Sequence, residues 1–501
     1  MTDFDLAVVG GGIIGAGIAR DAAGRGIRTV LVERDDLAAA PSSASTSLIH
    51  GGLDRLRHGE ARRLRHMLAE RDVLLRMAPH LVRPLRLVLP HHEGLRPPWH
   101  WQLRLFFHNR LGGRTLLPGA CTVDLTHSDA GVPLKRRFRL GFEFSGCRVD
   151  DARLVIVTAG DAAERGAMIL TRTRLARADR DGLAWRLVLN ARGRRQTLTA
   201  RVLVNAAGPW AAEVMERVIR LANPVPNRLV KGCHIVVHRL FDHDQAYMFQ
   251  NRDGRVLYAI PYERDFTLIG PTEVAWAGHP DAVAVEPQEI TYLCRVASVH
   301  FREPVEPQRV VHAFAGVRVL PGGTAVSPGD RRRDHRLVLD APPRQAPLLT
   351  VHGGEIATHR RIAEAALATL ARHLPFAPPW TGKVPLPGGD FPFDEIAAVV
   401  RRARWQWPFL SESNLRRLVA AYGTRLDQVL GRAASLSGLG PCFGDELTAA
   451  EVSHLIRREW AQSPDDVLWR RTRLGLRTGA DEQAALARFI AASAPHEAAA
   501  E

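Results

Sequence analysis

Lysine is nearly absent from this chain of 501 residues. Only Lys135, Lys231 and Lys383 contribute to a total of 68 basic residues, so arginine carries almost all of the formal net charge of +15. Such a bias fits the codon usage of a GC-rich genome. A positive charge by itself favours a nucleic-acid or an anionic-membrane partner. Because no nucleic-acid-binding motif accompanies the charge, we expect no nucleic-acid partner.

Paired cysteines and long apolar runs are also missing. The five cysteines show neither CxxC nor metal-ligand spacing, and they are Cys121, Cys147, Cys233, Cys294 and Cys442. We therefore expect reduced thiols and no metal site. No stretch approaches the ~18–20 uncharged apolar residues of a membrane span, and nothing before the first apolar run resembles a signal peptide. The length and the composition, 46% hydrophobic, allow a large core and two or three domains.

The segment 4–33 has the pattern of a dinucleotide-binding unit. An apolar run leads into Gly10, Gly12 and Gly15, a small-residue helix follows, and a second apolar run ends at Glu33. Gly10 allows the turn, Gly12 lets the backbone approach a pyrophosphate, and Gly15 lets the helix pack closely. An acid at the end of the second strand can accept hydrogen bonds from a ribose. The whole pattern predicts a bound dinucleotide.

Beyond this unit the chain alternates between helical and strand-rich stretches. Apolar periodicity predicts helices over 60–78 and 360–371. Aromatic and β-branched alternation over 230–272 predicts an antiparallel sheet. Proline-rich segments from residue 375 onward resemble a linker, and 388–501 has helical patterns throughout.

Residues 96–118 mix tryptophan, phenylalanine and arginine. One interpretation is a helix that packs its aromatic side into the core. The other is a helix that lies on an anionic membrane surface. The sequence leaves both open.

Several motifs point to one family. They are GGGIIGAGIARDAAGRG at 10–26, SSASTSLIHGGL at 42–53, MAPHL at 77–81, GFEFSGCRVDDARLV at 141–155, NAAGPW at 205–210, VKGCHIVV at 230–237, AGVRVL at 315–320 and DDVLWRRTRLGL at 465–476. Together they resemble the FAD-dependent, aerobic-type glycerol-3-phosphate dehydrogenases over almost the whole chain.

The resemblance implies an α/β fold with a Rossmann-like FAD-binding domain of the D-amino-acid-oxidase type, an antiparallel-sheet substrate domain and an all-helical C-terminal domain. The implied boundaries are an oxidoreductase region at 1–380, in which FAD-binding segments at about 1–75, 150–210 and 345–375 interleave with substrate segments at about 76–149 and 211–344, and a helical domain at 388–501.

The family's activity is oxidation of the C2 alcohol of sn-glycerol 3-phosphate to dihydroxyacetone phosphate, with electrons passed to quinone. The resemblance thus implies FAD as cofactor and a cytoplasmic protein held peripherally at the inner face of the cell membrane. The positive charge and the aromatic segment fit an anionic membrane surface. A homodimer is compatible with the sequence.

The resemblance also implies site residues. The expected FAD contacts are Gly10, Gly12, Gly15, Glu33, Ser42, Ser43, Ala207, Gly208, Gly353, Gly354 and Thr358. A helix starting after Gly354 would aim its amides at the negative charge of reduced flavin, with Thr358 as a donor.

Oxidation of an alcohol also needs a base, and a neutral histidine suits that role. We rank His234 first and His50 second, the alternative being histidines of the core or surface. Arg318 and Arg333 match family arginines near substrate or flavin, and a solvated surface cation is the alternative for each. We count Arg318 among the catalytic residues together with the two histidines. The expected substrate contacts are Arg55, Arg318, Arg333 and Thr272.

Two positions depart from the family pattern in charge. Asp54 and Glu355 stand where the family has cations, while Arg55 and His359 replace tyrosines. A charge-assisted hydrogen bond is worth ~1.5–3 kcal/mol, so the loss of two cations would weaken phosphate binding. Either the arginines rebuild the phosphate site, or the substrate is a different, non-phosphorylated alcohol or amine. A flavin-binding protein without catalysis is the third hypothesis.

Overall fold

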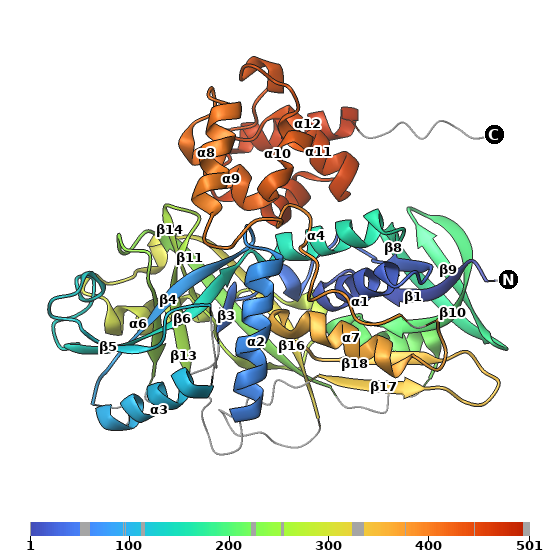
Figure 1. Ribbon diagram of the computed structural model, residues 1–501, viewed down its shortest axis with the longest axis horizontal. Helices are drawn as coiled ribbons and strands as arrows, with labels where there is room; N and C mark the ends of the chain where they lie inside the picture. The colour runs from blue at the N-terminus through green and yellow to red at the C-terminus, as the bar shows by residue number, and fades with distance from the viewer. Residues whose placement is uncertain are drawn as a thin grey trace.

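The computed structural model describes residues 2–50, 61–93, 95, 97–111, 116–221, 227–251, 255–322, 335–375, 377–444 and 446–493. Two β-sheets lie side by side, and a bundle of C-terminal helices sits against them (Figure 1). This architecture confirms the predicted D-amino-acid-oxidase-type fold with a helical C-terminal part.

The first sheet has the strand order β17-β18-β10-β1-β2-β7, and a β8–β9 meander pairs with β10. The pairs from β18 to β7 are parallel. The strands are β1 (Phe4–Val9), β2 (Thr29–Val32), β7 (Met168–Leu170), β8 (Thr173–Asp181), β9 (Ala184–Ala191), β10 (Arg194–Asn205), β17 (Arg336–Asp340) and β18 (Leu348–His352).

Both faces of this sheet are buried, which explains its unbroken apolar strands. Leu6 and Val8 of β1 face one core cluster that includes residues of α1 (Ile13–Gly24) and α7 (His359–Thr369). Their neighbours along the strand face the meander instead. Helix α4 (Asp151–Glu164) packs against α1, as Figure 1 shows.

The second sheet is almost entirely antiparallel, with order β15-β11-β14-β13-β12-β4-β6-β3, while β16 pairs with β11 and β5 with β6. The strands are β3 (Leu48–His50), β4 (Val82–Pro90), β5 (Cys121–Asp124), β6 (Leu140–Val149), β11 (Asn227–His238), β12 (Ala246–Gln250), β13 (Val256–Tyr262), β14 (Phe266–Gly270), β15 (Val274–Trp276) and β16 (Val310–Pro321).

Alternate residues of β11 serve opposite faces of this sheet. Ile235 and Val237 join the core under α6 (Pro287–His300), and Val236 joins the core that holds part of α3 (Pro98–Leu111).

The C-terminal helices have a core of their own. They are α8 (Ile396–Gln406), α9 (Glu412–Tyr422), α10 (Leu426–Leu430), α11 (Ala449–Glu459) and α12 (Ala480–Ser493). Ser411 caps α9 by accepting a hydrogen bond from the Asn414 amide at 3.1 Å.

Both helices expected from apolar periodicity are present. The helix expected over 60–78 is α2 (Ala61–Met77), and the one expected over 360–371 is α7. Helix α5 (Ala211–Glu213) is a single short turn. Helix α3 buries Trp101 and Leu105 but leaves Trp99 64% and Leu103 46% exposed, so it has features of both interpretations. Within the described part of the chain, no helix combines the length and apolarity needed to cross a membrane.

Candidate functional site

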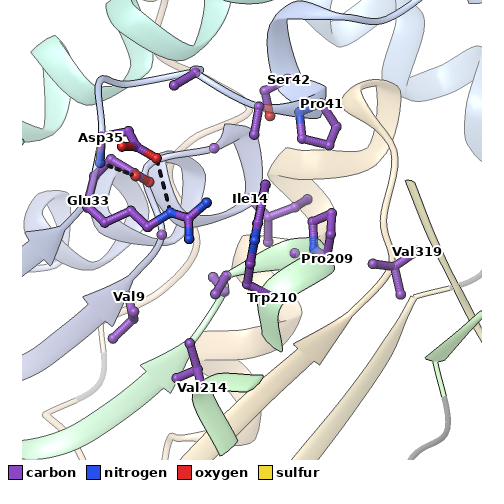
Figure 2. A pocket seen from close by; sticks show the side chains of 18 of the residues that line it. Val9, Ile14, Glu33, Asp35, Pro41, Ser42, Pro209, Trp210, Val214 and Val319 are labelled. Atoms are coloured by element: carbon purple, nitrogen blue, oxygen red, sulfur yellow. Dashed lines mark hydrogen bonds and ion pairs between the residues drawn. The ribbon is translucent and has the colours of Figure 1, made fainter. Parts of the chain in front are cut away.

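A first cavity opens where four parallel strands end. It is lined by Gly10 and Gly12 after β1, Glu33 after β2, Ala207 and Gly208 after β10, and Gly353 and Gly354 after β18. In parallel sheets the carboxyl ends of the strands are the usual place for a bound nucleotide. Figure 2 shows this cavity with Glu33, Ser42 and Trp210 on its wall.

The glycines at the turn are required by close contacts. Gly10 has φ +111°, and a Cβ there would lie 2.5 Å from the Ala206 carbonyl oxygen. A Cβ on Gly15 would lie 1.9 Å from the Gly10 carbonyl oxygen, so α1 can approach the turn only without that side chain. Gly12 begins α1 as its N-cap and leaves its backbone open to the cavity. This bare cradle fits a pyrophosphate.

Glu33 organises the ribose end of the cavity. Its carboxylate accepts hydrogen bonds from the Gly11 amide at 2.6 Å and the Asp35 amide at 2.8 Å. Burial raises the pKa of Glu33. The Arg34 guanidinium lies over the Trp210 ring at 4.4 Å and provides a flat wall nearby. These features fit the adenosine half of a dinucleotide.

The segment after β18 differs in detail from the expectation. Gly353 and Gly354 have φ of +73° and +108°, which keeps them out of a right-handed helix. A 3₁₀ turn at Ile356–Thr358 follows, and α7 begins only at His359. The Thr358 hydroxyl donates to the Glu355 carbonyl at 3.3 Å, and Thr358 is not among the residues that line the cavity.

Of the two serines expected to contact FAD, only one lines the first cavity. Ser42 lines the first cavity, where its Oγ accepts from the Ile13 amide at 3.1 Å. Ser43 donates to the Ala40 carbonyl at 3.3 Å and lies outside that lining.

A second cavity shares a wall with the first. The shared residues are Ile13, Pro41, Ser42, Val317, Arg318, Val319 and Gly354. Beyond this wall the second cavity is lined by His234, Thr272, Glu273 and Glu355. A substrate placed there would lie against the inner end of a ligand in the first cavity.

His234 lies in the middle of β11, is 2% exposed, and stacks on Phe314 of β16 with ring centroids 5.0 Å apart. Its Nε2 is 3.1 Å from the Thr46 hydroxyl. Among the described residues Nδ1 has no hydrogen-bond partner. Burial, with a smaller contribution from the Arg318 charge, lowers the pKa of His234 to about 3. The imidazole is therefore neutral at neutral pH.

Charged residues of both signs line the second cavity. Arg318 donates a hydrogen bond to the Glu273 carboxylate, and both side chains are partly exposed. Thr272 is 3% exposed, and its Oγ accepts from the Cys233 amide at 2.9 Å. Among the described lining residues, Arg318 is the one cation, against the acids Glu273 and Glu355.

Some predicted site residues lie beyond what the structure describes. Arg55, Arg333 and Asp54 fall outside the described residues. His50 ends β3, and its backbone pairs with Gly146. His359 is buried beside α1, where its Nδ1 contacts the Ile356 carbonyl at 2.7 Å, and it does not line the second cavity.

Sequence reasoning missed two residues of the second cavity region. Thr46 belongs to the same motif as Ser42 and His50, yet nothing in the motif shows that its hydroxyl meets a histidine of β11. Phe314 pairs with His234 across β11 and β16. Only the strand pairing brings these side chains together.

Comparison with known proteins agrees with this geometry. Residues 5–360 match the family model "FAD dependent oxidoreductase", and 379–497 match "C-terminal domain of alpha-glycerophosphate oxidase". Glycerol-3-phosphate dehydrogenase of Pseudomonas aeruginosa is 43% identical over 498 residues, which cover 98% of this chain and 96% of the relative. The chain belongs to the FAD-dependent glycerol-3-phosphate dehydrogenase family.

Other members of this family differ in the substrate they are named for. Aerobic glycerol-3-phosphate dehydrogenase of Escherichia coli is 42% identical, with 98% of both chains covered. D-erythritol 1-phosphate dehydrogenase of Brucella abortus is also 42% identical, with 97% of both chains covered. Glycerol-3-phosphate dehydrogenase of Bacillus halodurans, solved with FAD, shares the fold with a TM-score of 0.75 at 24% identity, covering 98% of this chain and 94% of that one.

FAD is the cofactor of this family member, and the first cavity offers the matching cradle of glycines, acid and aromatic wall. The protein is therefore an FAD-dependent oxidoreductase.

Proposed function

We propose that this protein oxidises the C2 alcohol of sn-glycerol 3-phosphate to dihydroxyacetone phosphate and passes the electrons to a quinone. The observation that carries the proposal is a neutral, buried histidine beside an arginine in a cavity that shares its wall with the FAD cradle. The names of two relatives above 40% identity support the substrate. FAD, when bound, supplies the acceptor for the C2 hydride.

His234 takes the hydroxyl proton in this proposal. A pKa of about 3 keeps the imidazole able to accept a proton but makes it a weak base. A bound phosphate dianion would favour the imidazolium, because opposite charges stabilise each other in a buried site. Arg318 presents a planar fork for that phosphate once Glu273 yields its hydrogen bond. We keep His50 as the second candidate for the base.

A longer polyol phosphate is the second candidate substrate. The D-erythritol 1-phosphate dehydrogenase is as similar as the Escherichia coli relative. Glu273 and Glu355 on the cavity wall offer carboxylate oxygens that accept hydrogen bonds from additional hydroxyl groups. The non-phosphorylated alcohol or amine and the non-catalytic flavoprotein remain as outcomes of the test below.

Anaerobic flavin bleaching tests the substrate directly. The purified holoenzyme is mixed with sn-glycerol 3-phosphate, D-erythritol 1-phosphate, glycerol or an amino alcohol, and the visible flavin band is followed. We expect loss of the band with glycerol 3-phosphate. Faster bleaching by the erythritol compound would select the second candidate, and bleaching by glycerol or the amine alone would remove the phosphate from the proposal. No bleaching by any of them would contradict catalysis.

We further propose that the protein works at the inner face of the cell membrane, where quinone resides. The exposed Trp99 and Leu103 of α3 and the positive net charge support contact with an anionic surface. Oxidation of the reduced enzyme by a short-chain quinone, followed by the return of the flavin band, tests the acceptor. Size-exclusion chromatography with light scattering tests a homodimer.

A further inference from the structure

We infer that Arg473, in the C-terminal helical part, positions the proposed base His234. It does so through a line of hydrogen bonds that links the C-terminal helices, helix α4 and the second sheet. The inference rests on the proposed function, because it concerns how the Thr46–His234 pair is held. Asp151 lines neither cavity, and Arg473 lines a third cavity that shares Pro41 and Val317 with both. We therefore assign both residues a positioning role.

The line begins at a buried arginine. Arg473 is 8% exposed and stands just before a short 3₁₀ turn at Leu474–Leu476. Its φ of +57° is rare for a residue with a side chain, so the surrounding contacts must hold it. The guanidinium donates to the Asp151 carboxylate, to Asp150 at 3.2 Å and to the Tyr262 hydroxyl.

Asp151 is the junction between the C-terminal part and the cavity wall. It is fully buried at the first turn of α4, the helix that lies between the bundle and the sheets in Figure 1. Oδ1 faces Arg473, whereas Oδ2 accepts from the Ser45 hydroxyl at 2.6 Å and the Ser45 amide at 3.1 Å. A buried carboxylate needs such a full set of partners to stay charged. Even with these partners, burial raises the pKa of Asp151 above its ordinary value.

These bonds fix the backbone on both sides of Thr46. Ser45 is held by Asp151, and its Oγ accepts from the Ser47 amide at 3.0 Å. The Ser47 carbonyl in turn accepts from the Val149 amide at 2.9 Å. These bonds hold the residues on either side of Thr46, and the Thr46 hydroxyl meets His234 Nε2 at 3.1 Å.

The bond from Thr46 decides which imidazole nitrogen is left for the substrate. A histidine whose one nitrogen has a fixed partner is restricted in tautomer and ring orientation. The ring face is already fixed by Phe314. Loss of Arg473 would leave Asp151 free to take up a proton and turn from Ser45. Thr46 would then shift relative to His234.

A double-mutant cycle separates this role from a general loss of stability. Arg473→Gln, Thr46→Val and the double variant are compared for kcat and KM with the substrate that bleaches the flavin. We expect Arg473→Gln to lower kcat on the order of tenfold, with KM little changed and FAD retained. In the Thr46→Val background the same substitution should lower kcat no further. Effects that multiply would overturn the inference.

Arg425→Gln is the matched control. Arg425 also links the C-terminal helices to α4, through an ion pair with Glu164 at the far end of the helix. It should leave kcat and its pH profile unchanged, whereas Arg473→Gln should shift the pH profile of kcat. If Arg473→Gln fails to fold, Ser45→Ala interrupts the same line one step nearer to Thr46 and takes its place in the cycle.

A spectroscopic readout makes the inference independent of turnover. In protein labelled at histidine ¹³Cε1, the His234 resonance is assigned by its loss in His234→Asn. Arg473→Gln should shift that resonance, whereas Arg425→Gln should not. In the Thr46→Val background, Arg473→Gln should cause no further shift. An unmoved resonance would contradict the line of hydrogen bonds. If none of the candidate substrates bleached the flavin of the wild-type enzyme, that result would instead contradict the proposed function alone.

Discussion

The Thr46 hydroxyl and His234 Nε2, 3.1 Å apart, join the segment that follows the FAD cradle to strand β11 of the second sheet. Both residues line the second cavity, which shares Ser42 and Arg318 with the first. The proposed base thus contacts the same segment that carries Ser42 of the first cavity. This relationship leads to the first prediction.

His234→Asn should lower kcat by about 10²–10⁴-fold, because an amide cannot take the hydroxyl proton. FAD content should stay normal, since His234 does not line the first cavity. His238→Asn, at the exposed end of the same strand, is the control. Stopped-flow flavin reduction measures the effect, and equal rates in His234→Asn and the wild type would exclude His234 as the base.

Gly12→Ala should reduce FAD affinity more than it reduces stability. Its Cβ would point toward Ser42 Oγ at 3.0 Å, at the place where the backbone faces the cavity. Gly160→Ala is a matched control within α4, because its Cβ meets nothing within 4 Å. That change should be neutral or stabilise by up to about 1 kcal/mol. Flavin fluorescence during dilution of the holoenzyme, with thermal unfolding of the apoprotein, checks both.

Glu355→Lys should improve the use of sn-glycerol 3-phosphate. The substitution replaces an anion on the second cavity's wall with a cation, and a charge-assisted hydrogen bond to phosphate is worth about 1.5–3 kcal/mol. KM should fall by about tenfold or more. Glu355→Gln removes only the negative charge, so its KM should lie between those of the wild type and the Lys variant. A rise in KM for the Lys variant would indicate that Glu355 itself binds the substrate.

Stability should fall as the pH drops below about 6.5. Burial lowers the pKa of His80 and His234 to about 3, and that of His300 and His359 to about 4. Between those values and about 6.5 the unfolded chain binds more protons, so acid favours unfolding by up to about 1.4 kcal/mol per pH unit for each histidine. Urea unfolding at about pH 7 and about pH 5 measures the slope. His80→Asn should remove one histidine's share, and an unchanged slope would contradict the assignment.

Trp99→Ser and Leu103→Ser should weaken binding to anionic vesicles, because both side chains are exposed on α3. Leu183→Ser is the control, since Leu183 is 72% exposed between β8 and β9, in a different region. Co-sedimentation at low salt gives the measurement. Equal loss in all three variants, or no binding by the wild type, would argue against α3 as the contact.

The sequence by itself determined the local units of this fold. The strand–turn–helix–strand of 4–33 and helix α2 follow from residue spacing, because short-range periodicity acts within a few residues. The glycine cradle belongs to the same class, since φ and close backbone approach depend on immediate neighbours and one strand partner. The motifs then identified the family.

Only the tertiary structure decided which side chains meet. The pairing of Arg318 with Glu273, the contact of Thr46 with His234 and the hold of Arg473 on Asp151 join residues far apart in sequence. No local pattern encodes such contacts, because they depend on how two sheets and a helical bundle pack. For the same reason His359 could be read as a cavity residue, although packing buries it against α1. Spacing along the chain determines the elements, and long-range packing determines the chemistry between them.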